Sequence, residues 1–440
     1  MTHRSAPAAL AALCGLLLVP LAPGPARADT PLPATGAPAT GAPATGAPVA
    51  GASAGAEPSS LPTIGQTNSA FQQQGCLHAS ARSTDLTPWA QTFLRPDAAW
   101  SLSQGAGVTV AVLGSGVDGT SGVFGGRLAL GPREYGPGDS GRDCVGHGTF
   151  LAGLIAAGRQ SGVGFAGVAP AARILAVAIT DDVGNTAADQ VSRGIRAAAD
   201  GGARVIDLAM PLPPGSGQLA DALHYADGKG ALVIVPATVD PSGASAGAAA
   251  AQAPTAPDVL AVADLGPGGA PAQSPSQSAA PASPAAARVD LVAPGDSVMS
   301  VGPGGVGYFT GTGPSFAAAF VAGTAALVLG YRPELTTEQL VHRLEATAYH
   351  PGTALPDPQL GYGTVDPVAA VSAVLPEEHG TAPAPTPSAA STAMPPVRPQ
   401  PAGRQAASVA GGALGVAVLV GCAAVVLPRG RRRSWRPGPS

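Results

Sequence analysis

Residues 308–330 read YFTGTGPSFAAAFVAGTAALVLG, and the fold and function of the chain depend on how this stretch is interpreted. A strand-like run ends in a glycine-rich turn, Ser315 follows, and a long run of small apolar residues then predicts a buried helix. Serine at a helix N-terminus is most often an ordinary N-cap. The same position also suits a nucleophile, because free N–H groups and the helix dipole stabilise an oxyanion there. This stretch alone leaves both interpretations open.

Apolar runs typical of strands buried on both faces alternate with helical patterns through the middle of the chain. This alternation predicts a doubly wound α/β fold with a parallel sheet, in which ligands bind at the carboxyl ends of the strands. Gly114, Thr238 and the turn before Ser315 all follow predicted strands. The predicted strands are 108–113, 173–179, 204–210, 231–237 and 258–263, with a short extended run at 288–294, and the predicted helices are 150–158, 187–200, 219–227, 315–330 and 336–348.

The two ends of the chain differ from the middle in composition. A short apolar run that ends in an A-x-A site predicts a signal peptide at 1–28. Near the other end, 407–427 are 21 uncharged residues, which is long enough for one membrane-spanning helix. The arginine-rich tail that follows is expected to be cytoplasmic, so the remainder is extracytoplasmic. The predicted plan adds a low-complexity spacer (29–65), an N-terminal extension (66–105), the main domain (106–375), a Pro-rich linker (376–406) and the basic tail (428–440).

Charge and cysteine usage limit the possible partners. The net charge of −4 gives no reason to expect nucleic acid, and neither a metal site nor a cofactor is predicted. Cys14 lies in the predicted signal peptide and Cys422 in the predicted membrane helix. Cys76 and Cys144 remain on the outer side, where disulfides persist. A Cys76–Cys144 disulfide is therefore predicted, with two free thiols as the alternative.

Three local motifs, in this order along the chain, carry a family resemblance. They are GHGT at 146–149 with AG at 152–153, VDLVAPG at 289–295, and SFAA at 315–318 with VAG at 321–323. Together they resemble the motifs of the subtilisin-like serine proteases, or subtilases. The resemblance implies a three-layer fold with a seven-stranded parallel sheet. It also implies that His147 and Ser315 occupy the positions of the catalytic histidine and serine.

Further motifs narrow the resemblance to the mycosins, the membrane-anchored subtilases of type VII secretion systems. The signal peptide, Pro-rich linker, single C-terminal span and short basic tail also resemble the mycosin plan. The resemblance implies an extracytoplasmic domain and a link to the type VII secretion membrane complex, with secreted proteins as possible substrates. The motifs are Cys76-Leu77, Trp89, Trp100-Ser101, Cys144, GYG at 361–363 and VDP at 365–367.

The chain departs from the subtilase pattern at positions that perform chemistry. The family's triad aspartate ends the first core strand, where its carboxylate orients the histidine, but this chain has Gly114 there. Asp118 matches the family's second aspartate instead. Thr238 replaces the oxyanion-hole asparagine and keeps one O–H donor on a shorter arm.

The predicted substrate-binding strand also differs from the family pattern. It ends in Ala209, Met210 and Pro211, and proline lacks an N–H where an extended peptide would pair. Around the serine, Pro314 replaces a threonine and Ala319 replaces a proline.

These departures predict a catalytically impaired pseudoprotease that acts as a structural or binding component of a type VII secretion system. In subtilisin, loss of the aspartate alone lowers kcat by about 3 × 10⁴, and loss of an oxyanion donor costs about 10²–10³. The alternative is an active serine endopeptidase that processes secreted proteins through a Ser315/His147 dyad, with water or Asp118 in place of the carboxylate. A third possibility is a peptide-binding module, which Pro211 disfavours.

Overall fold

The computed structural model describes residues 61–65, 75–213, 216–241, 259–272, 288–305 and 307–379. The predicted signal peptide (1–28), membrane helix (407–427) and basic tail (428–440) lie outside the described residues, as do most of the predicted spacer and linker.

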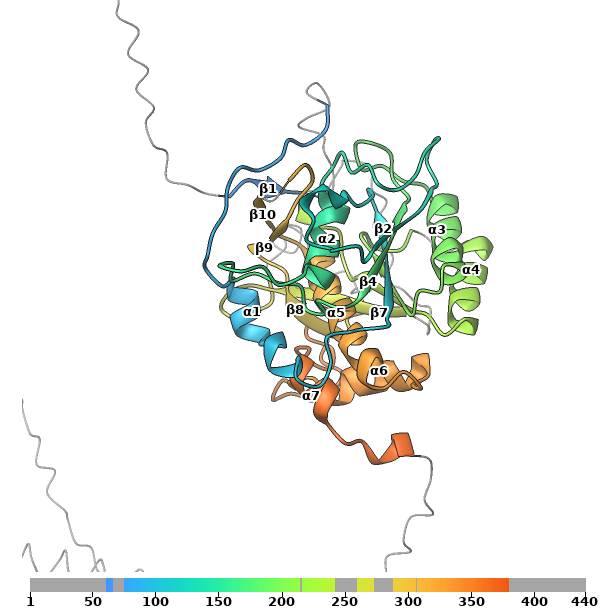
Figure 1. Cartoon of the computed structure of the whole chain (residues 1–440). Coiled ribbons are helices and arrows are strands. Elements are labelled where there is room, and N and C mark those ends of the chain that lie inside the picture. Colours follow the sequence, from blue (N-terminus) through green and yellow to red (C-terminus); the bar gives the residue numbers. More distant parts are fainter. Residues whose placement is uncertain are drawn as a thin grey trace, which may run out of the picture. The chain divides into compact units, whose positions relative to one another are not determined.

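A seven-stranded parallel sheet forms the centre of the domain, in the order β3-β4-β2-β5-β6-β7-β8. Its strands β2, β4, β7 and β8 are labelled in Figure 1. Every pair of neighbouring strands runs parallel. The predicted parallel α/β fold is therefore confirmed. The strands are β2 (Thr109–Gly114), β3 (Leu128–Arg133), β4 (Arg173–Ala178), β5 (Val205–Leu208), β6 (Leu232–Pro236), β7 (Val259–Leu265) and β8 (Leu291–Pro294).

Helices cover both faces of this sheet, as successive residues of the central strands indicate. Val110 and Val112 of β2 belong to the same buried cluster as the helices α2 (His147–Ala156) and α5 (Pro314–Tyr331). The alternate β2 residues Ala111 and Leu113 pack with α3 (Ala188–Asp200) and α4 (Gly217–Gly228). Side chains alternate between the faces of a strand, so both helical layers bury apolar surface against β2.

Helix α5 is the central helix of the fold (Figure 1). It is long and apolar enough to cross a membrane, but 89% of its most apolar window is buried inside the domain. It packs against β5, β6, β7 and β8 and against α2. Burial on all sides explains why the segment is apolar around its whole circumference rather than on one face. We therefore assign α5 as a core helix.

A smaller sheet leads the chain into α5. It has the order β1-β10-β9, with β1 (Thr63–Ile64), β9 (Val298–Val301) and β10 (Tyr308–Gly311). Strands β9 and β10 are antiparallel, and the N-terminal β1 pairs parallel to β10. The turn before α5 is thus fixed at the end of a paired strand.

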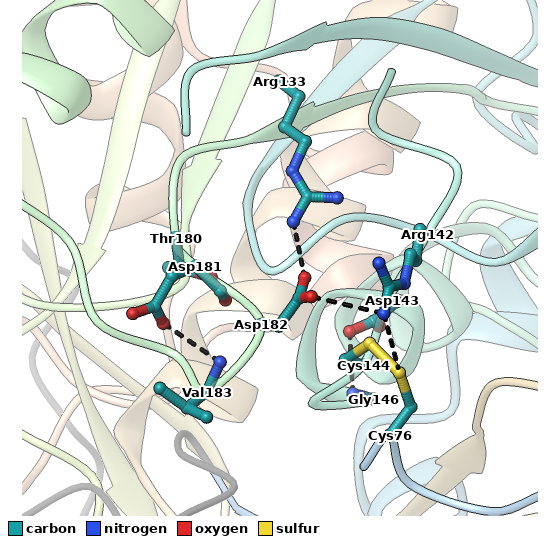
Figure 2. The surroundings of a disulfide bond; sticks show 10 residues. All are labelled: Cys76, Arg133, Arg142, Asp143, Cys144, Gly146, Thr180, Asp181, Asp182 and Val183. Atoms are coloured by element: carbon teal, nitrogen blue, oxygen red, sulfur yellow. Dashed lines mark hydrogen bonds and ion pairs between the residues drawn. A yellow bond between two sulfur atoms is a disulfide. The ribbon is translucent and has the colours of Figure 1, made fainter. Parts of the chain in front are cut away.

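The N-terminal extension is attached to the domain by covalent and hydrogen bonds. The predicted disulfide between Cys76 and Cys144 is confirmed, with a Cα–Cα distance of 4.1 Å (Figure 2). Leu77 N also donates to Cys144 O at 2.8 Å, and Trp100 Nε1 donates to Val168 O at 2.8 Å. The remaining elements are α1 (Trp89–Leu94), η2 (Pro96–Ala99), η3 (Gly119–Ser121), α6 (Thr337–Ala346), α7 (Pro367–Ser372) and η5 (Pro376–His379).

Candidate active site

His147 and Ser315 meet at the N-termini of the two core helices. His147 is the first residue of α2, and Ser315 is the second residue of α5. The His147 Nε2 atom lies 2.9 Å from Ser315 Oγ, which is hydrogen-bonding distance. Both residues are buried, with exposed fractions of 2% and 0%. The structure therefore brings together the two residues that the family motifs predicted as a pair.

A buried aspartate fixes the start of α2. Asp143 accepts hydrogen bonds from Gly146 N at 2.7 Å, from Thr149 N at 2.8 Å and from Thr149 Oγ1 at 2.6 Å. Burial raises the pKa of Asp143, and the hydrogen bonds from Thr149 act in the opposite direction. The His147 ring packs edge to face on Phe316, with ring centroids 5.1 Å apart. The position of the imidazole is thus set by its own helix and by α5.

Gly114, at the end of β2, offers the histidine no carboxylate. A Cβ atom built at Gly114 would lie 3.0 Å from Ala209 Cβ and 3.9 Å from Gly148 Cα, so this position faces the first turn of α2. Asp118 is used elsewhere, because its two carboxylate oxygens accept from Thr120 N and Gly304 N. The structure does not bring Asp118 to the histidine.

A different carboxylate occupies the site, and sequence reasoning missed it. Asp240 lies in the loop after β6 and is 1% exposed. Its Oδ2 atom accepts from Ser315 Oγ at 2.5 Å and lies 3.2 Å from His147 Nε2, while its Oδ1 atom accepts from Ser315 N at 3.0 Å. The available signal was an acidic residue just past the carboxyl end of β6, where ligands of α/β sheets bind.

Asp240 does not reproduce the catalytic triad. In a triad the carboxylate bonds to histidine Nδ1–H, which leaves Nε2 free to accept the serine proton. Within the part of the chain that the structure describes, both hydrogen bonds of the His147 ring use Nε2, and the Ser315 hydroxyl donates to Asp240. Asp240 also takes up Ser315 N–H, which is the backbone donor positioned for an oxyanion. A carboxylate thus fills the place where negative charge would develop in acyl transfer.

The other predicted site residues lie nearby. Thr238 is half-buried in the loop after β6, and among the described residues the side-chain partners of Ser315 are His147 and Asp240 rather than Thr238. Ala209 directly follows β5, and its N–H donates to Leu113 O at 2.9 Å. It is buried, whereas the next two residues, Met210 and Pro211, are half-buried.

Two further carboxylates make the surroundings of Asp240 acidic. The pKa of Asp264 is raised to about 7, mainly by burial and further by the charges of Asp240 and Asp296. A Cβ atom built at Gly295 would lie 2.4 Å from Asp264 Cβ and 2.6 Å from Gly313 O, so these segments are in close contact. Among the residues that the structure describes, no cluster of three or more His, Cys, Asp or Glu side chains is arranged to hold a metal ion.

Comparison with known proteins identifies the family. The model of the subtilase family matches residues 105–363. Mycosin-1 of Mycolicibacterium smegmatis is 31% identical over 353 residues, which cover 67% of this chain and 75% of that protein. The chain belongs to the mycosin branch of the subtilase family.

Solved mycosin structures share the fold. The crystal structure of MycP1 from Mycobacterium smegmatis has a TM-score of 0.57 and 28% identity, and the match covers 72% of this mycosin and 91% of that chain. A chain in the structure of the periplasmic assembly from the ESX-5 inner membrane complex has a TM-score of 0.58 and 27% identity, and the match covers 78% and 97% of the two chains.

Proposed function

We propose that this mycosin is a membrane-anchored, extracytoplasmic component of a type VII secretion system that acts as a structural or binding subunit with little or no proteolytic activity. Its family membership supports the link to secretion, since a similar chain is part of the periplasmic assembly from the ESX-5 inner membrane complex. One part of this proposal rests on sequence pattern alone, namely the membrane anchor (407–427), the signal peptide (1–28) and the other domain boundaries.

The observation that carries the loss of proteolysis is the position of Asp240. Its carboxylate holds the Ser315 hydroxyl at 2.5 Å and the Ser315 N–H at 3.0 Å. A substrate carbonyl would have to replace this carboxylate, and the tetrahedral oxyanion would then form beside a second negative charge if Asp240 stayed close. Like charges at this distance destabilise each other strongly in a buried site.

The missing triad aspartate adds to this effect. Without a carboxylate at Gly114, the imidazole has no partner there to fix its tautomer or to stabilise the imidazolium that forms during the reaction. In subtilisin this loss alone lowers kcat by about 3 × 10⁴. The two defects act on the same proton transfer, so their costs need not multiply, but either one is sufficient to make turnover very slow.

One contact favours the alternative, an active endopeptidase that processes secreted proteins through a Ser315/His147 dyad. The 2.9 Å distance between Ser315 Oγ and His147 Nε2 is within reach for general-base catalysis. This function would require Asp240 to leave the site when a substrate enters.

A fluorophosphonate probe distinguishes the two functions. The full-length protein in membranes is compared with Ser315→Ala, and with an active subtilase as the positive control. We expect no Ser315-dependent labelling on the time scale of that control. Labelling of the wild type at a comparable rate, abolished in Ser315→Ala, would sink the pseudoprotease proposal.

The secretion role needs a separate experiment. In a strain that lacks this mycosin and its export activity, the wild type, Ser315→Ala and His147→Ala are expected to restore export of secreted proteins equally. A variant truncated before residue 407 is expected to fail, because it lacks the predicted anchor. Full export by the truncated variant, or none by Ser315→Ala, would contradict this part of the proposal.

A further inference from the structure

We infer that the former catalytic centre is a binding site for a single carboxylate group, occupied here by the side chain of Asp240, and that an external monocarboxylate takes the same place once Asp240 is removed. The external group is either a small carboxylate or the free C-terminus of a peptide. This inference rests on the proposed function, because an active protease would reserve the same groups for the reacting carbonyl.

The donors converge on both oxygens of one carboxylate. The backbone N–H of Ser315 bonds to Oδ1, while the Ser315 hydroxyl and His147 Nε2 both approach Oδ2. Hydrogen bonds of a carboxylate to donors held by rigid elements are among the stronger ones in proteins, and they require little reorganisation. His147 and Ser315 are fixed in the first turns of α2 and α5, so the donor set does not depend on the loop that supplies Asp240.

The shape of the site matches a carboxylate closely. Gly313 makes the space, because a Cβ atom built there would lie 2.3 Å from Asp240 Oδ1 and 2.4 Å from its Cγ. Asp240, His147 and Ser315 are all nearly inaccessible, so the carboxylate is enclosed while the loop that supplies Asp240 stays in place. The side chain of aspartate beyond Cα is CH₂–COO⁻, which has the same heavy atoms as acetate. Removal of this side chain therefore leaves a site with the size and donors for acetate.

The surrounding carboxylates disfavour any charge on the ligand beyond the single one that the hydrogen bonds of the site stabilise. Asp264 lies close enough to Asp240 and Asp296 for their charges to affect its ionisation. A phosphate or sulfate dianion would be larger than the enclosed space and would be repelled by these carboxylates. A carboxamide is neutral and has one acceptor oxygen where a carboxylate has two, so it loses the charge-assisted hydrogen bonds and is expected to bind about tenfold or more weakly.

The test measures thermal melting of size-matched variants of the full-length protein in detergent. Asp240→Gly is titrated with sodium acetate and Asp240→Ala, which keeps Cβ, with sodium formate, each against sodium chloride at equal ionic strength. We expect melting temperatures that rise and then saturate with the matched carboxylate. Asp240→Asn, which keeps the side-chain volume, and the wild type are expected to show no saturating rise. Neither should phosphate raise the melting temperature of Asp240→Gly.

Several outcomes would overturn the inference. The first is that the matched carboxylate does not raise the melting temperature of Asp240→Gly or Asp240→Ala. The second is that it raises the melting temperature of Asp240→Asn equally. The third is that the rise in Asp240→Gly is unchanged when His147→Ala is added. If the glycine and alanine variants do not fold in chloride, the readout becomes the folded yield after dilution from urea. The matched carboxylate is then expected to raise that yield, and an unchanged yield would refute the site.

A second arm identifies the source of the carboxylate. A trialanine peptide with a free C-terminus is compared with its C-terminal amide on Asp240→Gly by isothermal titration calorimetry. Tighter binding of the free acid by about tenfold or more indicates a chain end; saturable acetate binding with no peptide binding rejects a chain end and indicates a small carboxylate. Ser315-dependent probe labelling of the wild type would refute the pseudoprotease proposal without altering these melting results, so the two failures are distinguishable.

Discussion

Asp207 provides a quantitative prediction about stability. It lies within β5, between Val112 of β2 and Ile234 of β6. Its exposed fraction is 0%, and neither carboxylate oxygen has a hydrogen-bond partner among the residues that the structure describes. Burial raises the pKa of Asp207 well above its usual value of 3.8. The perturbation we propose is Asp207→Asn, which keeps the shape but removes the ionisable group.

The sign and the size of the effect follow from proton linkage. A raised pKa in the folded state means that the folded protein binds this proton more tightly than the unfolded chain does. Stability is therefore greatest below the unfolded pKa and is lost as pH rises toward the folded pKa, by about 1.4 kcal/mol per pH unit for a single group. The wild type should therefore lose stability through Asp207 as pH rises above the unfolded pKa, until the folded pKa is reached.

The assay is urea unfolding of the wild type and Asp207→Asn at pH 5, 6 and 7. As pH rises, the difference in free energy of unfolding between them should shift in favour of the variant by up to about 1.4 kcal/mol per pH unit, because all other groups cancel. Asp221→Asn, on the exposed side of α4, is the matched control and should show a nearly constant difference. A constant difference for Asp207→Asn as well would refute the assignment of Asp207 as a protonated, unpartnered acid.

Further predictions follow from the site and the disulfide. Asp264→Asn should become stabilising relative to the wild type as pH rises from about 4 toward 7, by up to about 4 kcal/mol, because the pKa of Asp264 is raised to about 7 by burial; urea unfolding measures this, and a pH-independent difference would contradict it. Gly114→Asp should not restore probe labelling of Ser315, because Asp240 still holds the hydroxyl and a Cβ at residue 114 lies only 3.0 Å from Ala209 Cβ; labelling at the rate of an active subtilase would show that Asp240 does not block the site. Replacing both Cys76 and Cys144 by serine should lower the free energy of unfolding by about 4 kcal/mol on a loop-entropy estimate for a sequence separation of 68; no change would mean that the disulfide does not restrict the unfolded chain.

Most of the sheet could be predicted because its central strands are buried on both faces and read as continuous apolar runs. Strand β3 was not predicted, because it is an edge strand whose residues are half-buried or exposed and which contains Gly131 and Pro132. His147, Ser315 and the glycine at 114 could be found because each lies in a local motif. Asp240 could not, because it belongs to no motif and reaches Ser315 from 75 residues away through the path of a loop.

The residues that hold the backbone of the site are present, and so are His147 and Ser315, whereas the carboxylate that would orient His147 is missing and another one covers Ser315. Asp143 fixes the first turn of α2. Asp290 accepts a hydrogen bond from Ala261 N at 2.8 Å and forms an ion pair with Arg288, and these contacts join β7 to the start of β8. Gly114 and Asp240, in contrast, face the reacting groups themselves. A carboxylate bound to the serine also satisfies buried donors that an empty cleft would leave unpaired, so Asp240 stabilises the closed centre by the same contacts that prevent catalysis.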